Sequence, residues 1–240
     1  MLAGKYKGNV VVTGVCVVDG GAAVAKGDLI LAPGYALNAT FSSGTASLTV
    51  KGDIKVGSGA LLAMGCEPNE TPCTDNPNAA GQNTVFGNVT AFQAVGVLLH
   101  ASTMKGSVSV FGGGGGVSCN PPFPGAFADI ASTSFTDAED NSIGGNLTIT
   151  GLQSCWLGAL RNSVRGSVLV AGNTMADPDA MELLANKIHG SIACFNNSPP
   201  VLVARRSRSR LGLEGRGDVH SAGYSPVWAQ QGLLRFRAER

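Results

Sequence analysis

The sequence predicts an all-β fold, a single-stranded parallel β-helix (β-solenoid) formed by residues 1–202. Three observations predict it: a short motif recurs along these residues, each copy alternates apolar and other residues with period two, and the composition is rich in glycine. The chain has 34 glycines among 240 residues, about twice the usual share of roughly 7%. Charged residues make up only 14%, which excludes a coiled coil or helical bundle, and an apolar share of 44% excludes wholesale disorder.

The recurring motif is Gly, then Asn, Asp or Ser, then a branched apolar residue, any residue, and usually another apolar residue. Its eight copies begin at Gly8, Gly27, Gly52, Gly87, Gly106, Gly145, Gly166 and Gly190. The short intervals between these glycines cluster near 19 to 25 residues. An interval of 35 contains an insertion, Cys66–Gly81, and one of 39 contains Gly112–Gly125, so it is either one rung with an insertion or two rungs. Copies of this length predict strands that bury their apolar faces by stacking on one another.

The residues in front of the glycine extend the pattern. An apolar residue usually stands two positions before it, and Asn stands four positions before it at Asn83, Asn141, Asn162 and Asn186. Stacked copies would bring these amides within hydrogen-bonding distance, so we expect an Asn ladder. The glycine between the two halves suits a bend or a positive φ.

On these motifs the chain resembles right-handed parallel β-helix proteins of the pectate-lyase-like architecture, over roughly residues 5–200. It also resembles bacterial bactofilin-like cytoskeletal solenoids and uncharacterised actinobacterial secreted proteins. The resemblance implies right-handed winding and indicates no particular activity. Hexapeptide acyltransferases are less similar, because their strict six-residue repeat is absent here.

The charge divides the chain near Pro199-Pro200. Residues 1–202 carry nine basic and 13 acidic residues, a net of −4, whereas residues 203–240 carry eight Arg and three acids, a net of +5. This asymmetry predicts a folded domain, 1–202, with loop insertions, followed by an Arg-rich disordered tail, 203–240. The tail has three interpretations: an arm for nucleic acid or an anionic surface, a disordered tail, or a stretch from a shifted reading frame. From the folded domain we expect no nucleic-acid binding.

The N-terminal segment has two interpretations. Lys5, Lys7 and the apolar run 10–18 before Ala23-Val24-Ala25 fit a signal peptide, whereas Gly8–Val12 also fits a first rung, which we favour. If it is a rung, a leader lies upstream or the protein is cytoplasmic. No apolar stretch approaches 18 residues, so we expect no transmembrane segment.

Six cysteines permit three disulfides without fixing their connectivity. Cys66 and Cys73 flank a polar, proline-containing insertion, and we expect a disulfide between them. Such a bond implies an oxidising compartment, so we expect a secreted or cell-surface protein. Cys194 alternates with Ile192 and fits an ordinary core residue. The sequence indicates no metal site, because the Cys-x-x-Cys spacing of zinc sites is absent.

Candidate chemistry is sparse. The densest acidic group is Asp137, Glu139 and Asp140, which fits Ca²⁺ binding, acid–base attack on a sugar, or simply a solvated turn. We expect His100 to be structural and His189 to be exposed, while His220 lies in the tail. The run Gly112–Gly116 lacks a phosphate-loop context and fits a loop. Residues 177–187 form the one plausible short helix, although they also fit a rung turn.

These observations favour a non-enzymatic, exported β-solenoid that acts as a structural, surface or glycan-interacting module and needs no cofactor. Its expected partners are polysaccharide or further copies of itself, because an uncapped solenoid end exposes strand edges. The alternative is a polysaccharide lyase or glycoside hydrolase that acts through an acidic surface cluster at Asp137, Glu139 and Asp140.

Overall fold

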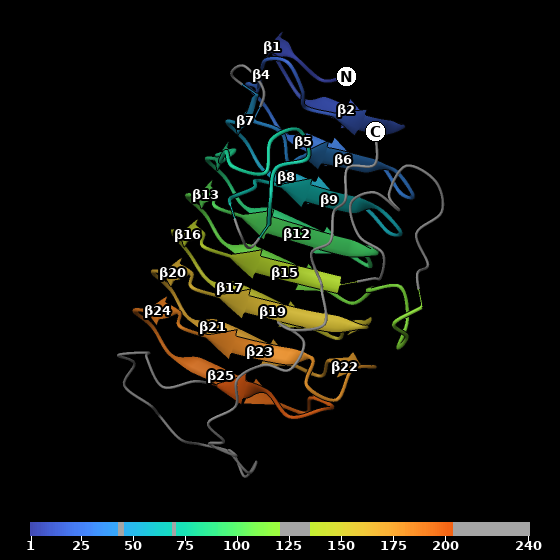
Figure 1. The fold of residues 1–240 in the computed structure, drawn as a ribbon, viewed down its shortest axis with the longest axis vertical. Coiled ribbons are helices and arrows are strands. Elements are labelled where there is room, and N and C mark those ends of the chain that lie inside the picture. Colours follow the sequence, from blue (N-terminus) through green and yellow to red (C-terminus); the bar gives the residue numbers. More distant parts are fainter. Residues whose placement is uncertain (43–45, 69–70, 121–134, 204–240) are drawn as a thin grey trace.

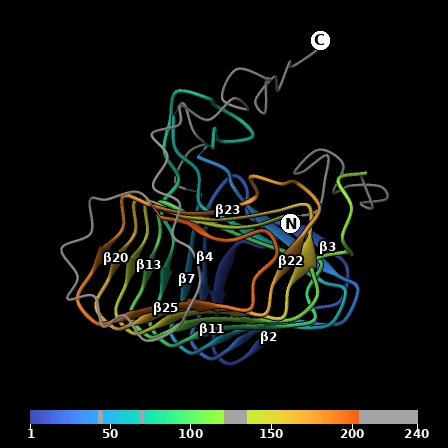
Figure 2. The same ribbon diagram turned by 90° about the horizontal axis from the view of Figure 1, so that it is seen from below.

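A computed structural model describes residues 1–42, 46–68, 71–120 and 135–203, and it shows a parallel β-solenoid. Three eight-stranded parallel sheets run along one column, and each turn of the chain, or rung, contributes one strand to each sheet (Figure 1). Viewed along the column, the sheets form its walls (Figure 2). The predicted fold class is therefore confirmed.

The strands are grouped by sheet. Sheet A contains β1 (Gly4–Tyr6), β4 (Ala22–Ala25), β7 (Ser47–Val50), β10 (Thr84–Val85), β13 (Thr103–Met104), β16 (Ser142–Ile143), β20 (Ser163–Val164) and β24 (Lys187–Ile188). Sheet B contains β2 (Val10–Val12), β5 (Leu29–Leu31), β8 (Ile54–Val56), β11 (Val89–Phe92), β14 (Val108–Phe111), β17 (Leu147–Thr150), β21 (Val168–Ala171) and β25 (Ile192–Phe195). Sheet C contains β3 (Val15–Val17), β6 (Ala36–Ala39), β9 (Leu61–Met64), β12 (Gly96–His100), β15 (Phe135–Glu139), β19 (Trp156–Leu160), β23 (Met181–Leu184) and β26 (Leu202–Val203). A two-stranded sheet pairs β18 (Gln153–Ser154) with β22 (Thr174–Met175).

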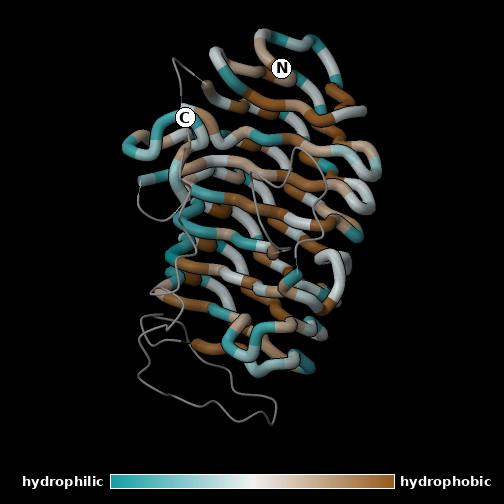
Figure 3. Tube along the Cα trace, turned by 45° about the vertical axis from the view of Figure 1, so that its right-hand side comes forward, coloured by the Kyte–Doolittle hydropathy of each residue, from teal (hydrophilic) through white to brown (hydrophobic). Residues whose placement is uncertain are grey.

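The period-two pattern of the motif places every second side chain inside the column. Val89, Val108, Leu147 and Val168 are register partners in neighbouring strands of sheet B, and all are buried. Hydrophobic segments accordingly recur from rung to rung (Figure 3). Because these stacked side chains exclude water along the whole column, the hydrophobic effect stabilises the fold as one continuous core.

The motif glycines lie at the corner between sheets A and B, which we call the glycine corner. The polar residue after each glycine accepts a hydrogen bond from the backbone N–H of the equivalent residue in the next rung, in an unbroken series from Asn9 through Ser107 to Ser191. A Cβ on Gly87 would lie 2.7 Å from the carbonyl oxygen of Gly52 in the preceding rung. The motif glycines have no positive φ, so the bend interpretation is right and the positive-φ interpretation is wrong. Close stacking, rather than backbone conformation, requires glycine here.

The expected Asn ladder lies at the corner between sheets C and A. The side-chain oxygen of Asn162 accepts hydrogen bonds from the backbone and side-chain N–H groups of Asn141, and Asn186 does the same for Asn162. Ser102 occupies the slot between Asn83 and Asn141. A second ladder, which we did not predict, joins Asn173 to Asn197 at the third corner. These bonds satisfy buried backbone groups where the chain leaves the sheets.

Both long intervals prove to be single rungs with an insertion. β14 pairs directly with β17, so the later insertion arises between two consecutive rungs. All five residues of Gly112–Gly116 have positive φ, which agrees with a loop. The expected disulfide joins Cys66 to Cys73, and a second joins Cys119 to Cys155, anchoring the later insertion to the column. The two disulfides agree with an oxidising environment.

Of the two interpretations of residues 177–187, the helix is wrong and the rung is right. These residues contribute β23, whose pairing with β19 and β26 overrides a weak helix signal, and the Asp177 carboxylate accepts the N–H of Asp179 in a turn. The expectation of a core Cys194 is also wrong. Cys194 is exposed, because β25 is the last strand of sheet B among the described residues. The residues that the structure describes contain no helix long and apolar enough to cross a membrane. The Arg-rich tail lies outside them, apart from Val203.

Candidate functional site

The outer face of sheet C differs from the outer face of sheet B. In sheet B most outward residues are exposed or half-buried, and Phe92 is 62% exposed. In sheet C the outward residues Leu98, His100, Asp137 and Glu139 are all buried. Buried ionisable side chains require partners, so this face contains the chemically unusual groups of the molecule.

His100 and Asp137 form a buried pair. His100 ends β12, Asp137 lies at the middle of β15, and His100 Nε2 is 3.0 Å from Asp137 Oδ2. Burial lowers the pKa of His100, but the negative charge and hydrogen bond of Asp137, with Glu139 and Glu67 nearby, raise it above its usual value overall. Asp137 Oδ1 is also buried and accepts no hydrogen bond from the described residues. The expectation that His100 is a structural histidine agrees with this pairing.

Glu139, Asp140 and Arg161 lie at the end of β15 and in the next rung. Asp140 and Arg161 both adopt a left-handed backbone conformation, at φ 53° and 55°, immediately before the Asn-ladder residues Asn141 and Asn162. This shared position stacks the two side chains one rung apart. Arg161 donates from Nε to Asp140 Oδ2 at 2.7 Å and from Nη2 to Glu139 Oε2 at 3.0 Å. The guanidinium thus bridges two carboxylates.

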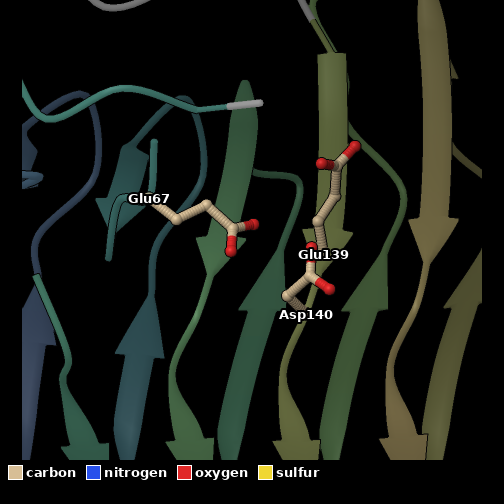
Figure 4. A group of neighbouring side chains, drawn as sticks. All are labelled: Glu67, Glu139 and Asp140. Carbon is tan, nitrogen blue, oxygen red and sulfur yellow. The ribbon is translucent and has the colours of Figure 1, made fainter. Parts of the chain in front are cut away.

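Glu67 reaches the same place from the first insertion. It follows Cys66 in a small hairpin that the Cys66–Cys73 disulfide closes, and its N–H donates to the carbonyl of Thr71. The Glu67 side chain extends from the insertion toward β12 and the end of β15 (Figure 4). Burial, followed by a hydrogen bond with Asp140 and the Asp140 charge, raises the pKa of Glu67 to about 7 against the opposing effect of Arg161. The Glu67 carboxyl is therefore largely protonated below neutral pH.

Glu67, Glu139, Asp140 and Arg161 form what we call the carboxylate–arginine cluster. Each of its three acids offers an oxygen within 4.8 Å of the others, a spacing that a cation could bridge. Arg161 Nη2 lies 2.6 Å from Asp140, 3.0 Å from Glu139 and 4.0 Å from Glu67. The guanidinium already supplies the positive charge at this position, so the geometry assigns no metal ion.

The structure brings the three predicted acids together only in part. Glu139 and Asp140 join one cluster, whereas Asp137 pairs with His100 one step away along β15. The expectation of a surface cluster or solvated turn is wrong for Asp137 and Glu139, which are 4% and 7% exposed. Sequence reasoning missed Glu67 and Arg161. Arg161 precedes Asn162 as Asp140 precedes Asn141, and this shared place in the repeat could have identified Arg161. Glu67 comes from an insertion with no repeat signal.

The remaining histidine prediction also holds: His189 is exposed, and His220 lies outside the described residues. Comparisons with protein-family models, with curated proteins and with solved structures find no match for this chain. The resemblance to parallel β-helix proteins is therefore supported at the level of solenoid architecture alone.

Proposed function

We propose that this chain is an exported, non-enzymatic structural module that self-associates head to tail by stacking the last rung of one copy on the first rung of the next. The observation that carries the proposal is Gly8. At each of the other seven motif glycines a Cβ would collide with the preceding rung, but at Gly8 no described atom lies within 4 Å of that position. The first rung therefore leaves the space beside Gly8 free for another rung to stack on.

The two ends of the column have matching chemistry. Within the column, each slot residue donates its N–H to the side-chain oxygen of the rung before it, as Ser191 donates to Ser167 Oγ. Ser191 Oγ at the last described rung and the N–H of Asn9 at the first would continue this series between two copies. The edge strands β24, β25 and β26 belong to the same three sheets as β1, β2 and β3, so all three ladders would continue in parallel register.

The apolar column supports the same arrangement. Ile192 and Cys194 occupy the register positions of Val168 and Val170, which face the core, yet Cys194 is exposed. Val10 and Val12 of a second copy would follow them and cover this apolar end. Because a head-to-tail contact of this kind does not close on itself, it produces a filament rather than a dimer.

The test uses the full chain and Gly8→Val. We expect the wild type to form filaments by negative-stain electron microscopy and to show concentration-dependent growth by sedimentation velocity, whereas Gly8→Val stays monomeric with an unchanged melting temperature. Gly21→Val is the matched control, because Gly21 also has free space at its Cβ position but lies at the start of the second rung. A wild type that is monomeric at every concentration, or a Gly8→Val variant that assembles normally, would falsify the proposal.

Cys194 provides an independent readout. Although Cys194 is exposed, the protein around its sulfur desolvates the thiolate and raises the pKa of the thiol to about 11. Alkylation should therefore be followed at about pH 8.5 rather than at neutral pH. We expect labelling of the Cys194 peptide to fall severalfold on assembly and to remain high in Gly8→Val. Equal labelling of assembled and monomeric protein would show that the filaments use another contact.

A second candidate is a polysaccharide lyase or glycoside hydrolase that acts through Asp137, Glu139 and Asp140. The raised pKa of Glu67, about 7, favours it, because acid–base attack on a glycoside requires a carboxyl group that stays protonated near neutral pH. The burial of Asp137 and Glu139 counts against it. Turnover of acidic polysaccharides that Asp137→Ala or Asp140→Ala abolishes would establish this function, and its absence in the wild type would reject it.

A further inference from the structure

A row of basic side chains runs along the column beside the glycine corner. It consists of the residue directly before each motif glycine, which we call the basic ladder. From the second rung onward the backbone N–H of each ladder residue donates to the preceding rung, as Arg165 N–H donates to the Ile143 carbonyl. These residues therefore lie above one another at a spacing of about 4.8 Å. In order they are Lys7, Lys26, Lys51, Phe86, Lys105, Gly144, Arg165 and His189, and all except Gly144 are exposed.

A row of hydroxyl groups lies beside the basic ladder on the outer face of sheet A. It consists of the residue two positions before each ladder residue, and strand pairing holds its members in register. All of them are exposed or half-buried: Lys5, Val24, Thr49, Thr84, Thr103, Ser142, Ser163 and Lys187. Sheet A forms its own wall of the column, apart from sheet C and its carboxylate–arginine cluster (Figure 2).

The two rows concentrate positive charge on a domain that is negative overall. Their six lysines and one arginine are seven of the nine basic residues in the folded domain. The other two, Lys55 and Arg161, lie elsewhere and are paired with carboxylates. Among the described residues, none of the seven forms an ion pair, and neither row contains an acid. Asp28 and Asp53, next to the ladder in the glycine corner, already accept hydrogen bonds from Lys55 and from the backbone of the following rung.

We propose that this wall of sheet A binds a linear acidic polysaccharide that lies along the column, with its carboxylates on the basic ladder and its hydroxyls on the Thr and Ser row. Cations in single file complement a polymer whose negative charges also recur along a line. Thr and Ser hydroxyls both donate and accept hydrogen bonds, as sugar hydroxyls require. Phe86 occupies a gap in the charges, and Lys51 Nζ lies 3.5 Å from the centroid of its ring, so the ring positions this cation.

Nucleic acid, the other common polyanion, fits this wall less well. Surfaces that bind single strands stack successive bases on aromatic side chains, whereas the two rows contain one aromatic residue, Phe86. The two disulfides also agree with an oxidising compartment rather than with the cytoplasm. Binding here does not depend on self-association, because the wall lies along the side of the column and both ends stay unchanged.

Binding of the full chain to immobilised alginate, a polymer with one carboxylate on each sugar, tests the proposal by biolayer interferometry. We expect binding that weakens between about 50 and about 200 mM salt, and none to neutral dextran. The triple variant Lys51→Gln/Lys105→Gln/Arg165→Gln removes three exposed charges from the ladder. We expect it to bind alginate at least about tenfold more weakly, with an unchanged melting temperature.

The matched control removes three charges from the Arg-rich tail, which lies outside the described residues. Arg205→Gln/Arg206→Gln/Arg208→Gln changes the net charge by the same amount, and we expect a loss of affinity below about threefold. Absence of binding in the wild type, retained binding in the ladder variant, or equal losses in the two triple variants overturns the proposal. Tighter binding of single-stranded poly-dT than of alginate, lost in the ladder variant, would assign the wall to nucleic acid and also overturns it.

Discussion

The glycine corner and the outer face of sheet C belong to the same rungs, but the residue types repeat from rung to rung in the first and vary in the second. In the glycine corner the same two-residue unit repeats eight times, and one hydrogen bond joins every neighbouring pair of rungs. On the outer face of sheet C the residue type changes between neighbouring rungs: one register position holds His100, Glu139 and Leu160 in turn. The repeated motif specifies the column, whereas the residues of sheet C that do not follow a repeat supply its buried ionisable groups.

The comparison also separates two sources of stability. In the glycine corner, stability depends on how closely backbones approach, so the smallest added group is harmful. On the outer face of sheet C it depends on charge balance among buried groups, so the sensitivity is to pH and to single charges. The predictions below test this separation, beginning with the largest expected effect.

Gly87→Ala should destabilise the fold by about 3 kcal/mol, because the new Cβ would meet the Gly52 backbone and the Asp53 side chain in the preceding rung. The free energy of unfolding from urea titration measures this. Gly21→Ala, which has free space at the same atom, is the control and should stay within experimental error. Comparable stability of Gly87→Ala and the wild type would show that the corner is not closely packed.

Arg161→Ala should cost about 2 kcal/mol at pH 7, because it leaves the buried Glu139 and the adjacent Asp140 without their cation. Since Arg161 opposes the rise in the pKa of Glu67, its removal should raise that pKa further and make the loss of stability larger as the pH rises from 5 to 8. Urea titrations at three pH values measure the trend. Arg161→Lys, which keeps the charge, should recover part of the loss; a pH-independent effect would contradict the charge-balance explanation.

Lys55→Ala should have the smallest effect. Lys55 Nζ is 2.7 Å from Asp28 Oδ2 on the exposed face of sheet B, where solvent and salt screen the pair. The thermal melting temperature should be unchanged within error at physiological salt. A clear decrease would show that charges matter on this face as well, and would remove the contrast with sheet C.

Much of the site lay beyond what the sequence could predict. The alternation of Phe135–Glu139 indicates that Asp137 and Glu139 share one face, but it does not say whether that face is inside, open or covered. The approach of Glu67 depends on the path of an insertion that carries no repeat, and the position of Arg161 depends on which rung follows β15. The expectation of a solvated acidic turn failed because the outer face of sheet C, which the repeat pattern places on the outside of the column, is buried at Asp137 and Glu139.

The sequence by itself determined the column: its motif repeats at rung length, and a repeated pattern has one solution in which every copy buries the same face and bonds to the next. Only the tertiary structure decided why the motif glycines are glycines, where the inserted hairpin lies, and which acids meet. The physical reason is that every copy of the motif carries the residues that make the stacking contacts. The cluster instead depends on single contacts between residues far apart in the sequence, such as Glu67 and Arg161, which are 94 positions apart.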